Sequence, residues 1–111
     1  MDDCIFCKIV SGKLPAQIVF SDDRVVVFKD IHPKARVHVL VVPRLHVASL
    51  DDVGPQHDAL LAHMLRLLPV IARGQGLDNG FRTVINTGPG GGQEVAHLHI
   101  HVLGGGPLPG F

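Results

Sequence analysis

The chain has 111 residues, of which 46% are hydrophobic and 18% are charged, and its ten basic and ten acidic residues leave no formal net charge. This composition predicts a globular domain with a modest core and excludes a disordered chain. With no basic run and no apolar stretch of roughly 18 residues, we expect neither nucleic-acid binding nor a membrane span. The acidic start, MDDCIFCK, lacks the basic region of a signal peptide, so we predict a cytoplasmic protein whose two cysteines are thiols or metal ligands rather than a disulfide.

In chain order, the first predicted element is a short helix over CIFCKIVSG (residues 4–12), capped by Asp3 and ended by its final glycine. Two strands follow in QIVFSDDRVVVFKDI (residues 17–31), around a turn at residues 21–24. The next segment, VHVLVVP (residues 37–43), is apolar on both faces, and we therefore expect it to be a central strand.

The second half of the chain predicts one long helix and two further strands. Apolar residues recur at helical spacing in GPQHDALLAHMLRLLPVIARGQG (residues 54–76), where we expect Pro69 to kink the helix or loosen its middle. The segments FRTVIN (residues 81–86) and AHLHIHVLGG (residues 96–105) predict strands on either side of a glycine-rich loop. The chain therefore predicts the α+β class, as a single domain over residues 1–111 with a five-stranded antiparallel sheet, one long helix and one short helix.

Three histidines, His97, His99 and His101, alternate with apolar residues in the last predicted strand. Side chains alternate across a strand, so the three imidazoles are expected on one face. The row has three interpretations: a solvated polar face, a His-x-His metal site, or catalysis on a phosphate with histidine as nucleophile and proton donor. Four glycines among residues 88–92 lead into the row, and bare backbone of this kind approaches anions closely, which favours the phosphate interpretation.

The segment HLHIHVL (residues 97–103) matches the signature of the histidine triad superfamily, in which three histidines alternate with apolar residues. The segments IFCKIVSGKLPAQIVFSDD, VFKDIHPKARVHVLVVPRLHV and NTGPGGGQEVAHLHIHVLGG resemble the Hint branch over nearly the whole chain. The resemblance implies a homodimer in which two sheets join, and attack on the α-phosphate of purine nucleoside phosphoramidates, with acyl-adenylates as further substrates. A dinucleoside polyphosphate hydrolase and a noncatalytic nucleotide- or zinc-binding module are the rival functions.

The resemblance also implies roles for individual residues. His99 is expected to attack and form a nucleotidyl-histidine, His101 to contact the phosphate and help the leaving group depart, and His97 to support the site, with no metal needed in the chemistry. Glu94 stands where some members carry Ser or Thr, so we expect its backbone N–H rather than its carboxylate to be useful. The residues expected to bind the nucleotide, with Asp30 accepting from the ribose and His38 alternatively serving only for packing, are Phe28, Asp30, Ile31, His38, Asn86, Gly92, Gln93, Glu94, His99 and His101.

The loop from Asn86 to Glu94 contains no lysine or arginine that would hold a polyphosphate leaving group. We therefore expect phosphoramidates to be the better substrates. Arg36 and Arg44 are the arginines that we consider able to reach the site.

Cys4 and Cys7 form a Cys-x-x-Cys pair, a spacing that suits zinc, although two ligands do not close a site. A redox pair and two buried thiols are the alternatives. The resemblance adds His46 and His97 as the remaining ligands of a structural zinc, which would tie the N-terminal helix to the sheet.

Overall fold

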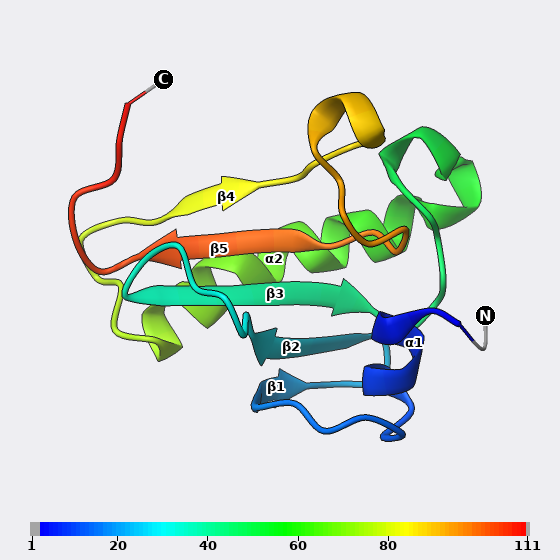
Figure 1. Cartoon of the computed structure of the whole chain (residues 1–111), viewed down its shortest axis with the longest axis horizontal. Helices are drawn as coiled ribbons and strands as arrows, with labels where there is room; N and C mark the ends of the chain where they lie inside the picture. Colours follow the sequence, from blue (N-terminus) through cyan, green and yellow to red (C-terminus); the bar gives the residue numbers. More distant parts are fainter. Residues whose placement is uncertain (1–2, 111) are drawn as a thin grey trace.

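A five-stranded antiparallel sheet forms the centre of the structure, a computed structural model that describes residues 3–110. Its strands pair in the order β1-β2-β3-β5-β4, which places the third strand in the centre, as predicted (Figure 1). In chain order they are β1 (Ile18–Ser21), β2 (Val25–Lys29), β3 (Val37–Pro43), β4 (Arg82–Val84) and β5 (Ile100–Gly104).

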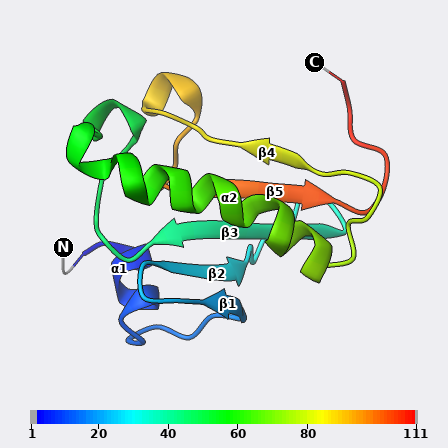
Figure 2. The same ribbon diagram turned by 180° about the vertical axis from the view of Figure 1, so that it is seen from behind.

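The two helices pack on opposite faces of the sheet. The long helix, α2 (Asp58–Gly74), lies across one face (Figure 2), and its residues Met64 and Leu68 pack against alternate residues of β2, β3 and β5. The short helix, α1 (Ile5–Val10), contributes Phe6 to a second core on the other face. The predicted α+β class, with one long helix and one short helix, is confirmed.

The strand register puts the polar site on the face that α1 covers. Leu40 of β3 pairs with Phe28 of β2 on one side and with His101 of β5 on the other. Directly paired residues point to the same face of a sheet, and so do residues two apart on one strand, so His38 shares that face. Ile100 and Val102 point the other way, into the core beneath α2.

The last strand begins at Ile100 rather than at residue 96, because the backbone before it is bonded elsewhere. The N–H of His97 donates to the carbonyl of Val95, and the N–H of Leu98 donates to the carbonyl of Val47 in the loop after β3. His97 and His99 therefore stand in the segment that leads into β5, which bends at residues 95–97, and of the three histidines only His101 lies inside the strand.

Three other expected element boundaries differ from the structure. The thiol of Cys4, not Asp3, caps α1 by accepting from the N–H of Cys7 at 3.4 Å. A 3-10 turn precedes α2, which then continues through Pro69 to its end without interruption. β4 is three residues long rather than six. Among the described residues, none of the helices has the length and apolarity needed to cross a membrane.

Candidate functional site

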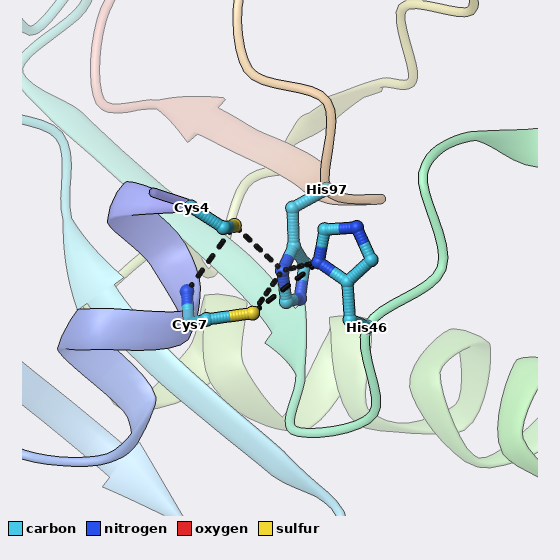
Figure 3. A group of neighbouring side chains, drawn as sticks. All are labelled: Cys4, Cys7, His46 and His97. Atoms are coloured by element: carbon cyan, nitrogen blue, oxygen red, sulfur yellow. Dashed lines mark hydrogen bonds between the residues drawn. The ribbon is translucent and has the colours of Figure 1, made fainter. Parts of the chain in front are cut away.

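Two groups of side chains with donor atoms lie close together on the α1 side of the sheet. The first, which we call the sulfur cluster, combines Cys4 and Cys7 at the start of α1 with His46 from the loop after β3 and His97 from the segment before β5 (Figure 3). Their four ligand atoms all lie within 4.8 Å of one another. All four residues expected to hold zinc are therefore brought together.

The distances in the sulfur cluster suit a tetrahedral metal. The Nδ1 atoms of His46 and His97 are 3.2 Å apart, and Cys7 Sγ lies 3.2 and 3.5 Å from them, respectively. Cys4 Sγ lies 3.4 Å from the Nδ1 of His97. Zinc bonds of about 2.0 to 2.3 Å at tetrahedral angles would separate such atoms by roughly 3.3 to 3.8 Å. The donor set therefore fits a zinc ion with little movement.

The other hydrogen bond of His97 directs its Nδ1 towards the sulfurs. Its Nε2 lies 2.8 Å from the carbonyl oxygen of Pro43, which can only accept, so Nε2 carries the proton and Nδ1 presents a lone pair. Burial lowers the pKa of His97 and keeps the ring neutral. Burial and the neighbouring Cys4 raise the pKa of the Cys7 thiol, and a bound cation would counter both effects.

The second group consists of Asp30, His38, His99 and His101, and we call it the phosphate cluster after the role that the sequence predicts for it. The ring centroids of His99 and His101 are 5.0 Å apart, and those of His38 and His101 are 5.1 Å apart. All four residues line a cavity of about 750 Å³. Apolar side chains from α1, the loop after it, and strands β2 and β3 line the cavity as well, so it combines an apolar wall with a row of imidazoles.

Among the residues that the structure describes, one ring nitrogen of His99 has a hydrogen-bond partner and the other has none. Its Nδ1 lies 2.7 Å from the carbonyl oxygen of His97, so Nδ1 carries the proton and Nε2 presents a lone pair. The ring of Phe6 packs edge-on against His99 with centroids 5.0 Å apart. This arrangement fixes the orientation of the imidazole at the cavity wall.

His38 links Asp30 to His101. Its Nε2 lies 2.8 Å from the Nδ1 of His101 and 3.5 Å from a carboxylate oxygen of Asp30. Burial, with help from His99 and His38, lowers the pKa of His101 to about 4, and burial also lowers the pKa of His38 although Asp30 opposes that shift. Both rings are therefore neutral near pH 7.

Most of the residues expected to bind a nucleotide line this cavity. Ile31 lies at its exposed rim, and Glu94 lines it as well. The expected residues found along the wall are Phe28, Asp30, Ile31, His38, Asn86, Gly92, Glu94, His99 and His101. His97 is not among the lining residues, but its carbonyl contacts His99 and its ring packs edge-on against Phe6, which lines the cavity.

Gln93 is an exception, because its side chain holds the loop instead of facing the cavity. Its amide oxygen accepts from the N–H of Gly88, and its Nε2 donates to the carbonyls of Ala48 and Val95. The side chain thus fixes the glycine loop against the segment that follows β3. Gln93 shapes the loop through these bonds, and its expected role in binding a nucleotide stays a prediction.

The cations beside the cavity are not the expected ones. Lys29 and Lys34 line it, whereas Arg36 and Arg44 do not. Arg44 instead donates to the carbonyls of Asp22 and Val10 at the far end of β2 and α1. The sequence carried one signal for the two lysines, their position on either side of Asp30, but neither a motif nor a periodicity pointed to them.

Comparison with known proteins gives consistent relatives. A family model described as "Scavenger mRNA decapping enzyme C-term binding" matches residues 3–106. The purine nucleoside phosphoramidase of Escherichia coli K12 is 40% identical over 108 residues, which cover 96% of this chain and 91% of that protein. A histidine triad protein from Clostridium difficile superposes with a TM-score of 0.96 at 45% identity, over 100% of this chain and 97% of that chain. A zinc-bound histidine triad family protein from Mycobacterium smegmatis superposes with a TM-score of 0.79 at 37% identity, over 92% of this chain and 74% of that chain.

Proposed function

The chain belongs to the histidine triad family, and from that premise we propose that it hydrolyses purine nucleoside phosphoramidates through a covalent nucleotidyl-histidine on His99. The membership itself agrees with the resemblance predicted from HLHIHVL. Hydrolysis as the class of reaction follows from the family, whereas the substrate and the intermediate are our proposal.

The observation that carries the proposal is the state of His99. A nucleophilic imidazole must be neutral and must expose one nitrogen lone pair to the reacting atom. The contact between Nδ1 and the carbonyl of His97 supports this role, because it keeps a proton on Nδ1, so that the neutral form of the ring carries its lone pair on Nε2. We propose that the neighbouring ring of His101, whose centroid lies 5.0 Å from that of His99, contacts an oxygen of the same phosphate.

The proposed reaction has two displacements at phosphorus. In the first, Nε2 of His99 bonds to the α-phosphorus, the phosphorus–nitrogen bond breaks, and the departing nitrogen takes a proton from water, which leaves a hydroxide ion that accepts the proton released by the attacking water in the second displacement. In the second, water attacks the same phosphorus, the bond to His99 breaks, and a nucleoside monophosphate is released with the imidazole again neutral. Most of the rate enhancement would come from positioning and from donors directed at the phosphoryl oxygens.

The cavity also supports nucleoside recognition. Phe28 and the exposed Ile31 offer apolar surface for a purine, and Asp30 stands between them on the chain. One oxygen of Asp30 already accepts from the N–H of His32 at 2.8 Å, which holds the carboxylate in place. We propose that the ribose hydroxyls donate to this carboxylate.

We propose that the sulfur cluster holds a structural zinc ion. Four protein ligands, Cys4, Cys7, His46 and His97, close the coordination shell and leave no position for substrate. When bound, the ion supplies a cross-link between α1, the loop after β3 and the segment before β5. The zinc-bound relative from Mycobacterium smegmatis supports the assignment.

We also propose a homodimer. β4 is an edge strand of the sheet, and apolar side chains are exposed near it and on α2: Leu65, Val70 and Phe81. A dimer that joins two sheets at their edges would cover such surface. Light scattering at micromolar concentration should give twice the chain mass, and a monomer would contradict this proposal.

The intermediate provides the test of function. Wild-type protein mixed with an adenosine phosphoramidate and quenched within milliseconds should carry one nucleotidyl group, located on His99 by peptide mass spectrometry. His99→Ala should fold, form no adduct and lose at least about a thousandfold in kcat/KM, because the loss of a nucleophile removes the reaction path. An adduct on another residue, or near-normal turnover by this variant, would overturn the proposal.

A further inference from the structure

A chain of hydrogen bonds runs from the backbone of Lys34 through His38 to His101. The Lys34 N–H donates to the Nδ1 of His38 at 3.0 Å, and the Nε2 of His38 lies 2.8 Å from the Nδ1 of His101. The two ring nitrogens in the second contact do not by themselves show which one carries the proton. The backbone amide does, because a main-chain N–H can only donate.

The amide sets the tautomer of His38. Since Nδ1 accepts from Lys34, it holds a lone pair, and a neutral His38 must carry its proton on Nε2. Asp30 acts in the same direction, because its carboxylate oxygen lies 3.5 Å from Nε2 and can only accept. The ring is buried, so water does not offer a competing arrangement.

The tautomer of His101 follows from that of His38. The Nε2–H of His38 donates to the Nδ1 of His101, so a neutral His101 must carry its own proton on Nε2. His101 lines the cavity, and its Nδ1 is already occupied by His38. The group left for a ligand is therefore an N–H donor.

We propose that His38 is a positioning residue that fixes His101 as a neutral hydrogen-bond donor towards the phosphate of the substrate, with the direction set by the backbone N–H of Lys34. This role rests on the proposed phosphoramidase function and deepens it. It distinguishes His99 from His101: the carbonyl of His97 leaves a lone pair on the neutral ring of His99, and the amide of Lys34, acting through His38, leaves an N–H donor on His101.

The same chain argues against a metal in the phosphate cluster. Asp30, His38 and His101 bring three donor atoms within 4.8 Å of one another. A metal at the Nε2 of His38 would require the proton to move to Nδ1, where it would face the Lys34 N–H. The contact of 2.8 Å between the rings is also shorter than two tetrahedral zinc ligands allow, which is roughly 3.3 Å.

The direct test reads the ring protons without any substrate. In protein labelled with ¹⁵N at histidine, long-range proton–nitrogen spectra at pH 7 show which ring nitrogen carries the proton, and single variants assign the signals. We expect the proton on Nε2 in both His38 and His101, and on Nδ1 in His99. A proton on Nδ1 of His101 would overturn the inference, whatever the protein hydrolyses.

Matched variants connect the tautomer to catalysis. In His38→Gln the amide nitrogen stands near the position of Nε2 and can still donate to His101, whereas the carboxylate of His38→Glu can only accept. We expect the glutamine variant to keep the His101 proton on Nε2 and kcat within about tenfold, and the glutamate variant to move that proton to Nδ1 and lose about a hundredfold, the usual effect of a lost transition-state donor. Equal kcat in the two variants, with both folded, would refute the proposed role.

A second pair keeps the test open if changes at His38 prevent folding. Lys34→Pro removes the backbone N–H, and Lys34→Ala removes only the side chain. We expect Lys34→Ala to show the wild-type tautomers and Lys34→Pro to show a mixture at His38. Wild-type tautomers in Lys34→Pro would show that the amide does not set the direction.

Discussion

The sulfur cluster and the phosphate cluster are both made of imidazoles a few ångströms apart, yet their chemistry differs. In the sulfur cluster the Nδ1 atoms of His46 and His97 face each other at 3.2 Å with two thiols beside them. In the phosphate cluster His38 and His101 approach to 2.8 Å through a single hydrogen bond. The first arrangement collects lone pairs that need a cation, and the second uses its lone pairs internally.

The difference comes from the backbone groups behind the rings. The carbonyl of Pro43 accepts a hydrogen bond from the Nε2–H of His97, which leaves the Nδ1 lone pair available for a metal. The N–H of Lys34 donates to the Nδ1 of His38, which leaves the Nε2–H available to donate to His101. In each neutral ring, the backbone partner of one nitrogen thus determines whether the other nitrogen offers a lone pair or an N–H.

His97 joins the two clusters, since its ring belongs to one and its carbonyl to the other. Loss of the metal should therefore disturb His99 only indirectly, through the position of the backbone. The experiments that follow separate the clusters, beginning with the largest expected effect.

Removal of a sulfur ligand should cost stability more than activity. We expect Cys7→Ser to lose the one zinc ion that wild-type protein binds per chain, and to lose at least about 3 kcal/mol of unfolding free energy, which is roughly 10 °C in Tm for a chain of this length. The carbonyl contact of His99 stays in place, so kcat/KM should fall by no more than about tenfold. Elemental analysis, calorimetry and steady-state kinetics measure the three quantities, with the exposed Ser11→Ala as a control. Wild-type protein that binds no zinc, or a variant that is equally stable, would favour two ordinary buried thiols.

The sequence predicted the residues of both clusters better than it predicted the state of their atoms. Alternation in HLHIHVL placed His99 and His101 on one face correctly, because side-chain direction is preserved in the extended segment before β5 as well as in the strand. The sequence overestimated the length of this strand, because no residue near His97 or Leu98 indicates that their N–H groups donate to Val95 and Val47 instead of to a neighbouring strand.

The tautomers depend on contacts between segments far apart in sequence. Pro43 and His97 are separated by 54 positions, and His38 and His101 by 63. Gln93 illustrates the same limit: the glycine loop was predicted correctly, but the carbonyl of Ala48 that binds this side chain lies 45 positions away. Residue types at a site can be read from a motif, whereas hydrogen-bond direction requires the folded backbone.

The protonation of His101 should lower the unfolding free energy of the protein in acid, whether or not a metal is bound. Because burial lowers the pKa of His101 from 6.5 to about 4, the unfolded chain binds a proton there at a higher pH than the folded chain does. The contribution of neutral His101 to the unfolding free energy is complete above about pH 6.5. It is lost as the pH falls towards 4, and the loss is at most about 3 kcal/mol. Urea unfolding between pH 7 and 4, in a Cys7→Ser background that removes the zinc effect, should show a smaller loss for His101→Asn. Identical slopes with and without His101 would mean that the ring is not held neutral.

The smallest expected effect is the preference between leaving groups, and it tests whether the cavity can hold the negative charge of a polyphosphate. We expect an adenosine phosphoramidate of an alkyl amine to exceed a dinucleoside polyphosphate in kcat/KM by at least about tenfold, or ~1.4 kcal/mol. Because burial lowers the pKa of His101 to about 4, this ring is neutral near pH 7, and we do not expect it to protonate the leaving group as an imidazolium in the free site. The nitrogen of an alkyl phosphoramidate becomes strongly basic only as the phosphorus–nitrogen bond breaks, and we propose that it then takes its proton from water, without an imidazolium acid. A polyphosphate instead brings negative charge that needs cations. Among the residues that the structure describes, only Lys29 and Lys34 supply them along the cavity, and the Nζ of Lys34 already donates to the carbonyl of His32 at 3.2 Å. The carboxylate of Glu94 lines the same cavity and repels added phosphate.

Glu94→Gln should therefore narrow the difference in kcat/KM between the two substrates, and Lys34→Ala should widen it. Equal or faster turnover of the dinucleoside polyphosphate by wild-type protein would mean that the two lysines outweigh Glu94, and would replace the phosphoramidase proposal with a polyphosphate hydrolase on the same His99.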